Sequence, residues 1–160
     1  MDIELMSKNY TVRRLDRNDV EILYDMMCKN KIFYQYHPPF VTRERILEDL
    51  ETLPPNKEYE DKYYVGFFEG DCLVASMDMI LSYPTENAAF IGFFMMDVQW
   101  QKCGVGSRII REVCSYLKRQ GFSKIRLGVD KGNPQSFAFW SKNGFSVVGE
   151  NEYIMMELGL

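Results

Sequence analysis

Histidine and cysteine are scarce in this sequence, with one histidine and four cysteines among 160 residues. The cysteines, Cys28, Cys72, Cys103 and Cys114, form no C-x-x-C pair. Structural zinc sites are built from closely spaced cysteine and histidine ligands, so no metal site is expected. The simplest interpretation of the cysteines is four free thiols in a reducing cytoplasm.

The sequence also lacks long apolar runs and an excess of positive charge. No stretch approaches the roughly 20 apolar residues of a membrane span. Residues 1–9 carry charges where a signal peptide would have an apolar segment. Nineteen basic residues stand against twenty-three acidic ones, for a net charge of −4. This balance argues against nucleic acid or an anionic membrane as a main partner.

The composition that is present favours one globular domain over residues 1–160. Hydrophobic residues make up 46% of the sequence and aromatic residues 14%. That share is enough to bury a sizeable core at this length. No internal repeat or low-complexity tract divides the chain.

Hydrophobic periodicity and turn residues predict a succession of strands and helices. Strands are predicted at 10–15, 63–68, 72–82, 88–96, 125–129, 145–149 and 153–158, and helices at 19–29, 42–50, 105–117 and 135–142. The aromatic, proline-broken segment 32–40 is predicted as a loop or short turn. The polar segment 54–62 is predicted as a mobile connection.

The order of these elements predicts the fold class. The strands between residues 63 and 96 are joined by short turns, which indicates an antiparallel meander, and Gly92 suggests a bulge or a close backbone approach. The strand–helix–strand unit from 88 to 129 predicts a right-handed parallel crossover. We therefore expect an α/β (α+β) domain with a mixed, mostly antiparallel sheet, a central parallel pair and flanking helices.

A glycine-containing turn, Gln101-x-x-Gly104-x-Gly106, lies between the strand that ends at Met96 and the helix that begins at Val105. Glycine lets the backbone approach a ligand without a Cβ in the way. The first N–H groups of the helix have no intrahelical partner, and with the helix dipole they attract phosphate oxygens. The alternative is an ordinary strand–helix turn whose glycines only permit packing.

A second motif follows the next strand: Asn133-x-x-Ser136-x-x-Phe139-Trp140-x-Lys142-x-Gly144-Phe145. With these two motifs in this order, the chain resembles the GNAT superfamily of N-acetyltransferases. The second string is similar to that family's N-x-x-A-x-x-[LF]-Y-x-K-x-G-F segment. The order of elements fits the family over nearly the whole chain, and residues 30–62 are not diagnostic.

The resemblance implies acetyl-CoA, or another acyl-CoA, as the donor substrate, and a central parallel pair that splays apart. The pyrophosphate would bind backbone N–H groups of Gln101, Lys102, Cys103, Gly104, Val105, Gly106 and Ser107. Pantetheine would run beside Met95, Met96 and Asp97, as an added strand would. Asn133 and Ser136 would line the coenzyme side of the next helix, and Phe139 would pack along the pantetheine arm.

Acetyl transfer to an amine needs a group that takes the amine proton and an N–H that stabilises the oxyanion. The resemblance places the oxyanion donor near Met96. Many family members have a tyrosine acid where this chain has Trp140, whose indole N–H is not acidic near neutral pH. Tyr153 is a candidate substitute. Tyr116 is a further candidate that could equally belong to the core.

The candidate bases are Asp78 and His37. Asp78 lies within an apolar strand, where burial would raise the pKa of its carboxyl. The alternative is an outward-facing charge. The lone histidine, His37, lies in an aromatic segment that suits either an acceptor pocket or packing over the sheet.

The sequence thus predicts an N-acetyltransferase that acts on a primary amine of a small molecule or peptide, by direct attack within a ternary complex. One alternative is a non-catalytic acyl-CoA-binding module that has lost its acid at Trp140. Another is an ATP-binding domain, but the turn lacks the G-K-[ST] lysine and hydroxyl. An exposed edge strand could pair in a homodimer.

Overall fold

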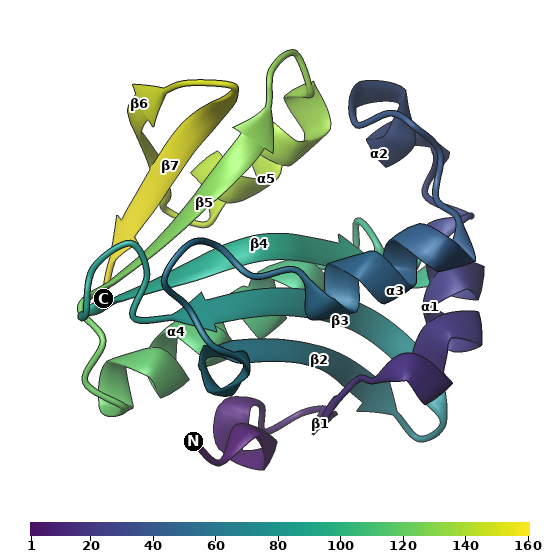
Figure 1. The fold of residues 1–160 in the computed structure, drawn as a ribbon, viewed down its shortest axis with the longest axis horizontal. Helices are drawn as coiled ribbons and strands as arrows, with labels where there is room; N and C mark the ends of the chain where they lie inside the picture. Colours follow the sequence, from purple (N-terminus) through teal and green to yellow (C-terminus); the bar gives the residue numbers. More distant parts are fainter.

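A computed structural model describes all 160 residues and shows one seven-stranded sheet flanked by helices (Figure 1). The strands lie in the order β1-β2-β3-β4-β5-β7-β6. They are β1 (Thr11–Arg14), β2 (Lys62–Glu69), β3 (Cys72–Leu81), β4 (Ala88–Met96), β5 (Lys124–Asp130), β6 (Ser146–Glu150) and β7 (Tyr153–Gly159). The helices are α1 (Val20–Met27), α2 (Lys31–Tyr36), α3 (Arg43–Glu51), α4 (Val105–Arg119) and α5 (Pro134–Lys142). The predicted fold class is confirmed.

The strands β2, β3 and β4 form the predicted antiparallel meander. Between β3 and β4 the pairing passes from Asp78 opposite Phe93 to Met79 opposite Ile91, which leaves Gly92 as an extra residue. A Cβ on Gly92 would lie 3.3 Å from the Asp78 carboxylate. The predicted bulge at Gly92 is therefore present, and the group that approaches this glycine closely is the side chain of Asp78.

The central pair of strands, β4 and β5, is parallel and short. Their pairing runs only from Ala88–Lys124 to Ile91–Leu127. Beyond this point β4 continues to pair with β3, whereas β5 continues with β7. Figure 1 shows β5 turning away from β4 toward β7. The last part of β4 therefore faces a gap in the sheet.

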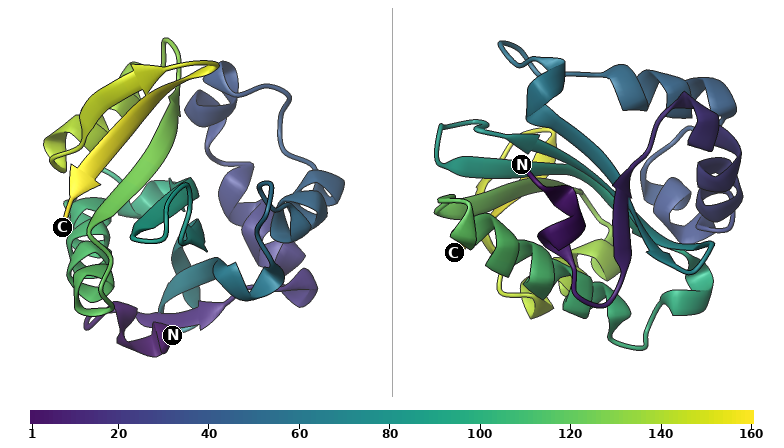
Figure 2. Two further views of the ribbon diagram at one scale, coloured as in Figure 1. Left: turned by 60° about the vertical axis from the view of Figure 1, so that its left-hand side comes forward. Right: turned by 90° about the horizontal axis from the view of Figure 1, so that it is seen from below.

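Helices cover the two faces of the sheet as separate layers, as the right-hand view of Figure 2 shows. The apolar stripe of α4, which includes Ile109, Val113 and Leu117, is fully buried against one face. Leu23 of α1 and Ile46 of α3 are fully buried against the other. Each such aliphatic side chain contributes roughly 1.5–3 kcal/mol of burial free energy. The side chains at the end of β4, beside the gap, pack alternately into the hydrophobic clusters on the two faces of the sheet.

The prediction of a loop at residues 32–40 is wrong in part, because Lys31–Tyr36 forms the helix α2. The prolines follow the helix and only end it, since no proline or glycine lies within Lys31–Tyr36. Phe33 of this helix packs edge-on against Phe93 of β4, with ring centroids 5.7 Å apart. Tertiary packing thus stabilises a helix that is too short to be stable alone.

Candidate functional site

A cleft of about 470 Å³ opens beside the gap between β4 and β5. Its walls come from the end of β4, the turn that follows it, the first turn of α4, the helix α5, the α1–α2 connection and the start of α2. The sequence predicted the walls from β4, α4 and α5. It missed Lys29 and Asn30 of the α1–α2 connection and Lys31 at the start of α2, which also line the cleft. A polar run between two apolar segments was the only signal for that wall.

The first turn of α4 presents unpaired backbone donors. The N–H groups of Gly104, Val105, Gly106 and Ser107 donate to no acceptor within the protein. The helix begins sharply because Gly104 has a positive φ of +83°, and a Cβ added there would meet nothing within 4 Å. Such a row of N–H groups at the positive end of a helix dipole is suited to bind phosphate oxygens.

Gly106 allows close packing at the start of α4. A Cβ at this position would lie 3.1 Å from the Phe139 ring and 3.5 Å from the sulfur of Met96. The absence of a side chain therefore lets α4 lie against α5 and β4. The packing interpretation of the turn thus fits Gly106, whereas the close approach of a ligand to the two glycines stays a prediction.

Gln101 positions the turn instead of offering its N–H to a ligand. Its side-chain Nε2 donates to Asn30 Oδ1 at 2.7 Å and to the Met96 carbonyl at 3.1 Å. Its backbone N–H donates to the Val98 carbonyl at 3.4 Å. The side-chain bonds tie the turn to the α1–α2 connection and to β4, and the bond to Val98 already occupies the backbone N–H that was predicted to contact the pyrophosphate.

The end of β4 offers backbone groups to the gap at alternate residues. The Asp97 N–H donates to the Val74 carbonyl at 2.9 Å, so Asp97 and Met95 direct their backbone groups toward β3. Phe94 and Met96 therefore direct theirs toward the gap. The sequence predicted Met96 for this position but missed Phe94, which the two-residue period of a strand would have indicated.

The remaining predicted coenzyme residues divide between cleft wall and support. Met95, Lys102, Ser107, Asn133, Ser136 and Phe139 line the cleft. The side chains of three others do not line it. Asp97 caps the turn, because its Oδ1 accepts a hydrogen bond from the Gln99 N–H at 2.9 Å and its Oδ2 lies 3.0 Å from Lys29 Nζ. Val105 is buried in the core, and Cys103 is exposed to solvent. The side chains of Asp97, Val105 and Cys103 therefore do not border the cleft, although the backbone N–H of Val105 belongs to the row of unpaired donors at the start of α4.

The helix α5 supplies the aromatic wall of the cleft. Asn133 caps the helix by accepting a hydrogen bond from the Ser136 N–H at 3.0 Å. Phe139 stacks on Phe94, with ring centroids 5.8 Å apart, and lies edge-on to Trp140 at 5.0 Å. Trp140 borders the cleft but is only 6% exposed. Its indole therefore belongs to the core as well as to the wall.

The candidate catalytic residues Asp78 and Tyr153 lie apart. Asp78 is on β3 and Tyr153 on β7, so β4 and β5 separate them in the sheet. Partial burial raises the pKa of the Tyr153 phenol, which makes it a weaker acid. Tyr116 is in the core, as the sequence allowed, and its hydroxyl donates to the Asp2 carbonyl at 2.6 Å.

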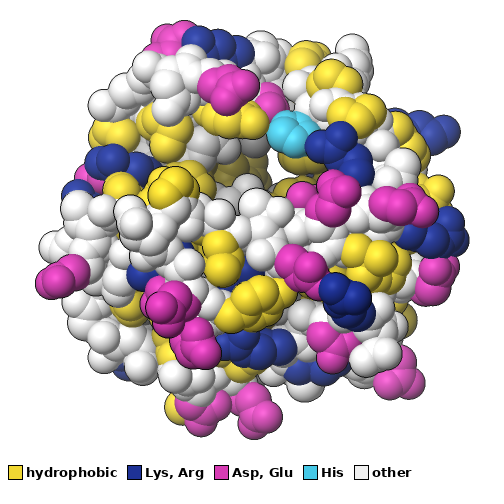
Figure 3. Space-filling model, viewed as in Figure 1, with side chains coloured by type: hydrophobic (Ala, Val, Ile, Leu, Met, Phe, Trp, Pro, Cys, Tyr) yellow, Lys and Arg dark blue, Asp and Glu magenta, His cyan; other side chains and the backbone are white.

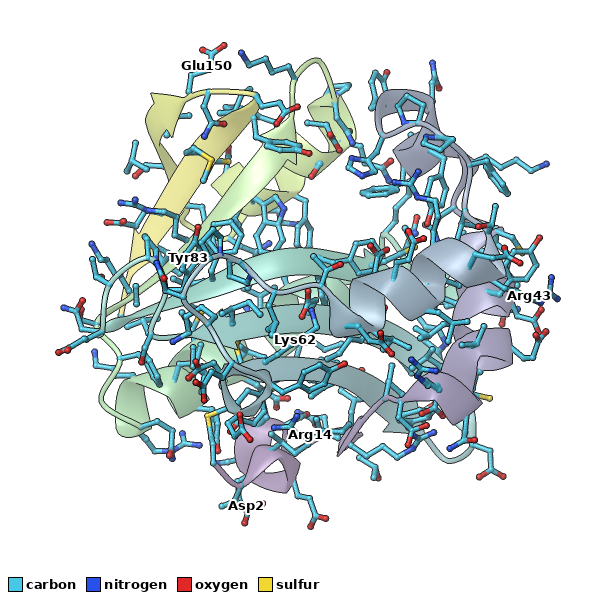
Figure 4. The ribbon with its side chains drawn as sticks, viewed as in Figure 1. Asp2, Arg14, Arg43, Lys62, Tyr83 and Glu150 are labelled. Carbon is cyan, nitrogen blue, oxygen red and sulfur yellow. The ribbon has the colours of Figure 1, made fainter.

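Asp78 forms a buried ion pair with Lys62, which is labelled near the middle of the sheet in Figure 4. Its Oδ2 lies 2.7 Å from Lys62 Nζ, and its Oδ1 is buried with no hydrogen-bond partner. Burial raises the pKa of the Asp78 carboxyl, and Lys62 opposes this shift. The raised pKa was predicted, whereas the lysine partner was not.

Two further properties of the structure concern metal binding and the crossing of a membrane. No group of three or more histidine, cysteine, aspartate or glutamate side chains is arranged to hold a metal ion. None of the helices combines the length and apolar character needed to cross a bilayer.

Known proteins share both the sequence pattern and the fold. The acetyltransferase (GNAT) family model matches residues 24–145. A ribosomal-protein-serine acetyltransferase from Escherichia coli (strain K12) is 26% identical over 153 residues, which cover 90% of this chain and 83% of that protein.

Among solved structures, an acetyltransferase from Thermus thermophilus matches with a TM-score of 0.82 and 20% identity, over 95% of this chain and 97% of that one. The PaiA N-acetyltransferase from Thermoplasma acidophilum, in complex with coenzyme A, matches with a TM-score of 0.71 and 20% identity, over 93% and 98% of the two chains. At this identity the structural likeness shows a shared fold.

Proposed function

Since the chain belongs to the GNAT family of acetyltransferases, we propose that it transfers the acetyl group of acetyl-CoA to a primary amine, by direct attack within a ternary complex in the cytoplasm. The observation that carries this proposal is the row of unpaired N–H groups from Gly104 to Ser107, beside the open edge of β4. The row suits a pyrophosphate, and the open edge suits the amides of a pantetheine arm.

In this arrangement the donor spans the cleft from α4 to the gap in the sheet. The pyrophosphate accepts hydrogen bonds from the first turn of α4, while Lys102 and Ser107 border it. The pantetheine arm lies between the backbone of Phe94 and Met96 on one side and Phe139 on the other. The thioester then reaches the place where β4 and β5 separate.

The reaction forms one bond and breaks one. The lone pair of the neutral amine attacks the thioester carbonyl, and a β4 backbone N–H near Met96 stabilises the oxyanion. When the carbonyl re-forms, the carbon–sulfur bond breaks, and the attacking nitrogen gives its extra proton to water as it becomes the amide nitrogen. Because Trp140 offers no acidic proton, coenzyme A leaves as a thiolate that takes its proton from water.

The acceptor belongs to a broad class, the primary amines of small molecules and peptides. The similarity to a ribosomal-protein-serine acetyltransferase supports the inclusion of protein amines in this class. A suitable first panel contains a peptide with a free N-terminal serine, a lysine-containing peptide, spermidine and an aminoglycoside. Mass spectrometry of the acetylated product identifies the acceptor directly, whereas a thiol reagent that detects released coenzyme A would also react with the exposed side chains of Cys72 and Cys103.

Binding of acetyl-CoA, measured by calorimetry, tests the donor site. Ser107 is the third residue of α4, where glutamate favours helix formation and can bond to the N–H of Gly104. Ser107→Glu should therefore fold normally but weaken acetyl-CoA binding at least about tenfold, since its charge repels the pyrophosphate.

Ser115→Glu makes the same change on the same helix away from the cleft and should bind like the unmodified protein. Equal affinity of Ser107→Glu and Ser115→Glu would refute the donor site proposed at α4.

One observation favours a second function, that of a non-catalytic acyl-CoA-binding module. Trp140 replaces the acid and is packed among Phe94, Phe139 and Phe145. The two functions differ in turnover, because only the enzyme produces acetylated amine. If acetyl-CoA binds but no amine in the panel is acetylated above background, the binding module is the better conclusion.

A further inference from the structure

The single histidine forms a carboxylate–imidazole pair across the gap in the sheet. His37 lies directly after α2, and its Nδ1 is 2.9 Å and 3.1 Å from the two carboxylate oxygens of Asp130, the last residue of β5. The His37 side chain is 39% exposed and that of Asp130 is 17% exposed. The aspartate is therefore largely shielded, while the imidazole remains open to solvent.

The carboxylate sets the tautomer of the imidazole. With two carboxylate oxygens at Nδ1, the proton of the neutral ring is assigned to Nδ1 and donated to Asp130. The lone pair then lies on Nε2, which makes no hydrogen bond within the protein. A histidine held in this way has a free nitrogen that can accept a proton.

The imidazole contacts the end of β5 from the side of the sheet where α2 packs with α1 and α3, and it lies next to Phe33 of the cleft wall without lining the cleft itself. Phe33, which lines the cleft, links it to the sheet: its ring centroid is 5.3 Å from that of His37 and 5.7 Å from that of Phe93 on β4. Asp130 is on the facing strand, β5. Figure 3 shows the imidazole (cyan) on the rim of a hollow.

The other charged and titratable groups near this pair come from two elements. Asp49 of α3 is close enough for the charge of His37 to lower the pKa of its carboxyl, although burial raises that pKa more strongly. Arg45 of α3 acts on Asp49 in the same direction as His37. Tyr153 of β7 pairs with Asp130 in the sheet register.

We propose that His37 is the general base of the acetyl transfer and that Asp130 is its positioning residue. This inference rests on the proposed function. An acceptor ammonium at the rim of the gap gives one proton to Nε2, and the resulting neutral amine attacks the thioester. The imidazolium, paired with Asp130, then releases the proton to water, which restores the base.

The pH dependence of kcat/KM for the best acceptor of the panel tests this role. His37→Gln should lower kcat/KM by about 10²-fold or more, the usual contribution of a general base. The rate of the unmodified protein should fall as the pH is lowered, because a protonated base cannot accept the proton of the amine. His37→Gln should lose this decrease and should bind acetyl-CoA with unchanged affinity.

Chemical rescue separates catalysis from a structural link between α2 and β5. Added imidazole should restore part of the activity of His37→Ala but should not affect the unmodified protein. Asp130→Asn should lower kcat more than it raises KM, because the imidazole remains but its tautomer is no longer fixed. Tyr36→Phe, one residue before His37, is the matched control and should be fully active.

The possible failures are distinguishable. If the unmodified protein acetylates no amine, both the proposed function and this inference fail. If it is active, and His37→Gln has the same rate and pH profile, His37 is not the base and the proposed function stands. A lower rate without rescue and with an unchanged pH profile would assign the pair a structural role and overturn the inference.

Discussion

The buried ion pair of Lys62 and Asp78 allows the stability of the protein to be separated from its catalysis. The side chains are 3% and 15% exposed, so removal of one partner leaves the other as an unpaired buried charge. Lys62→Met or Asp78→Val alone should each lower the free energy of unfolding by about 3 kcal/mol or more. The double variant should lose much less than the sum, because neither charge remains. Urea denaturation of the four proteins measures this coupling.

The activity of the folded double variant then tests Asp78 as a base. If His37 accepts the proton, the double variant should keep its kcat within a few-fold of the unmodified protein at 25 °C. A loss of about 10²-fold in a stably folded double variant would return the role of base to Asp78.

At the residue scale, the sequence predicted the surroundings of single residues but not the partners with which their side chains pair. The apolar neighbours of Asp78 were sufficient to predict a raised pKa for its carboxyl, because burial is a local consequence of a strand pattern. Lys62 is 16 positions away, Asn30 is 71 positions from Gln101, and Asp130 is 93 positions from His37. Such partners depend on strand register and helix placement, which no local pattern specifies.

An ion pair at the start of α1, between Asp19 and Arg13, should make the stability of the protein depend on pH. Asp19 accepts a hydrogen bond from the Asp16 N–H and pairs with Arg13 of β1, with Oδ1 2.7 Å from the guanidinium. The bond from Arg13 holds the pKa of Asp19 below its ordinary value of 3.8. A carboxyl whose pKa is lowered by folding stabilises the fold above the unfolded-state pKa, and this contribution is lost as the pH falls through the folded-state value.

Asp19→Asn should therefore be about 1 kcal/mol less stable than the unmodified protein at pH 7, a modest loss because Arg13 is 48% exposed. The difference should shrink progressively when urea denaturation is repeated at pH values below 3.8, as the Asp19 carboxyl becomes protonated in the folded protein. Glu86→Gln changes an exposed carboxyl in a turn and is the control. A difference for Asp19→Asn that stays constant over this range would contradict the ionic origin.

Elements with a strong period were predictable, and the short one was not. The helix α4 has an apolar stripe and a terminating glycine, Gly121, with a φ of +93°, so its extent was recognised to within a few residues. The helix α2 has only six residues, too few to show a helical period, and the prolines that follow it suggested a loop. Its contact with Phe93 stabilises it, and this same contact brings Phe33 and His37 to the site.

At the scale of the whole molecule, one edge of the sheet is open. Every residue of β6 is exposed, and Val147 and Val148 are 52% and 49% exposed. Such an edge can pair with a second copy, so the homodimer expected from the sequence stays a prediction. Sedimentation should then show a dimer that Val148→Lys converts to a monomer. A monomer at micromolar concentrations of the unmodified protein would contradict it.

The short parallel pairing of β4 with β5 joins the two halves of the sheet, β1–β4 and β5–β7. Where this pairing ends, the proposed donor would contact both halves. Between β4 and β5 the pairing ends at Ile91 and Leu127, whereas the cleft has walls from β4 and α4 on one side and from α5, which follows β5, on the other. A ligand that binds only the folded protein stabilises it by about 2.7 kcal/mol at 100 times its Kd. For a chain of this length, that corresponds to a rise in Tm of roughly 5–10 °C.

Coenzyme A and acetyl-CoA should give similar rises in Tm at equal concentrations, because both carry the pyrophosphate and the pantetheine arm and should therefore bind with similar affinity. At the ligand concentrations used for the unmodified protein, Ser107→Glu should show a much smaller rise. Differential scanning calorimetry should show one transition, shifted as a whole, since the ligand holds both halves of the sheet. Two transitions, of which only one moves with ligand, would mean that the donor binds one half alone and that the gap between β4 and β5 is not its site.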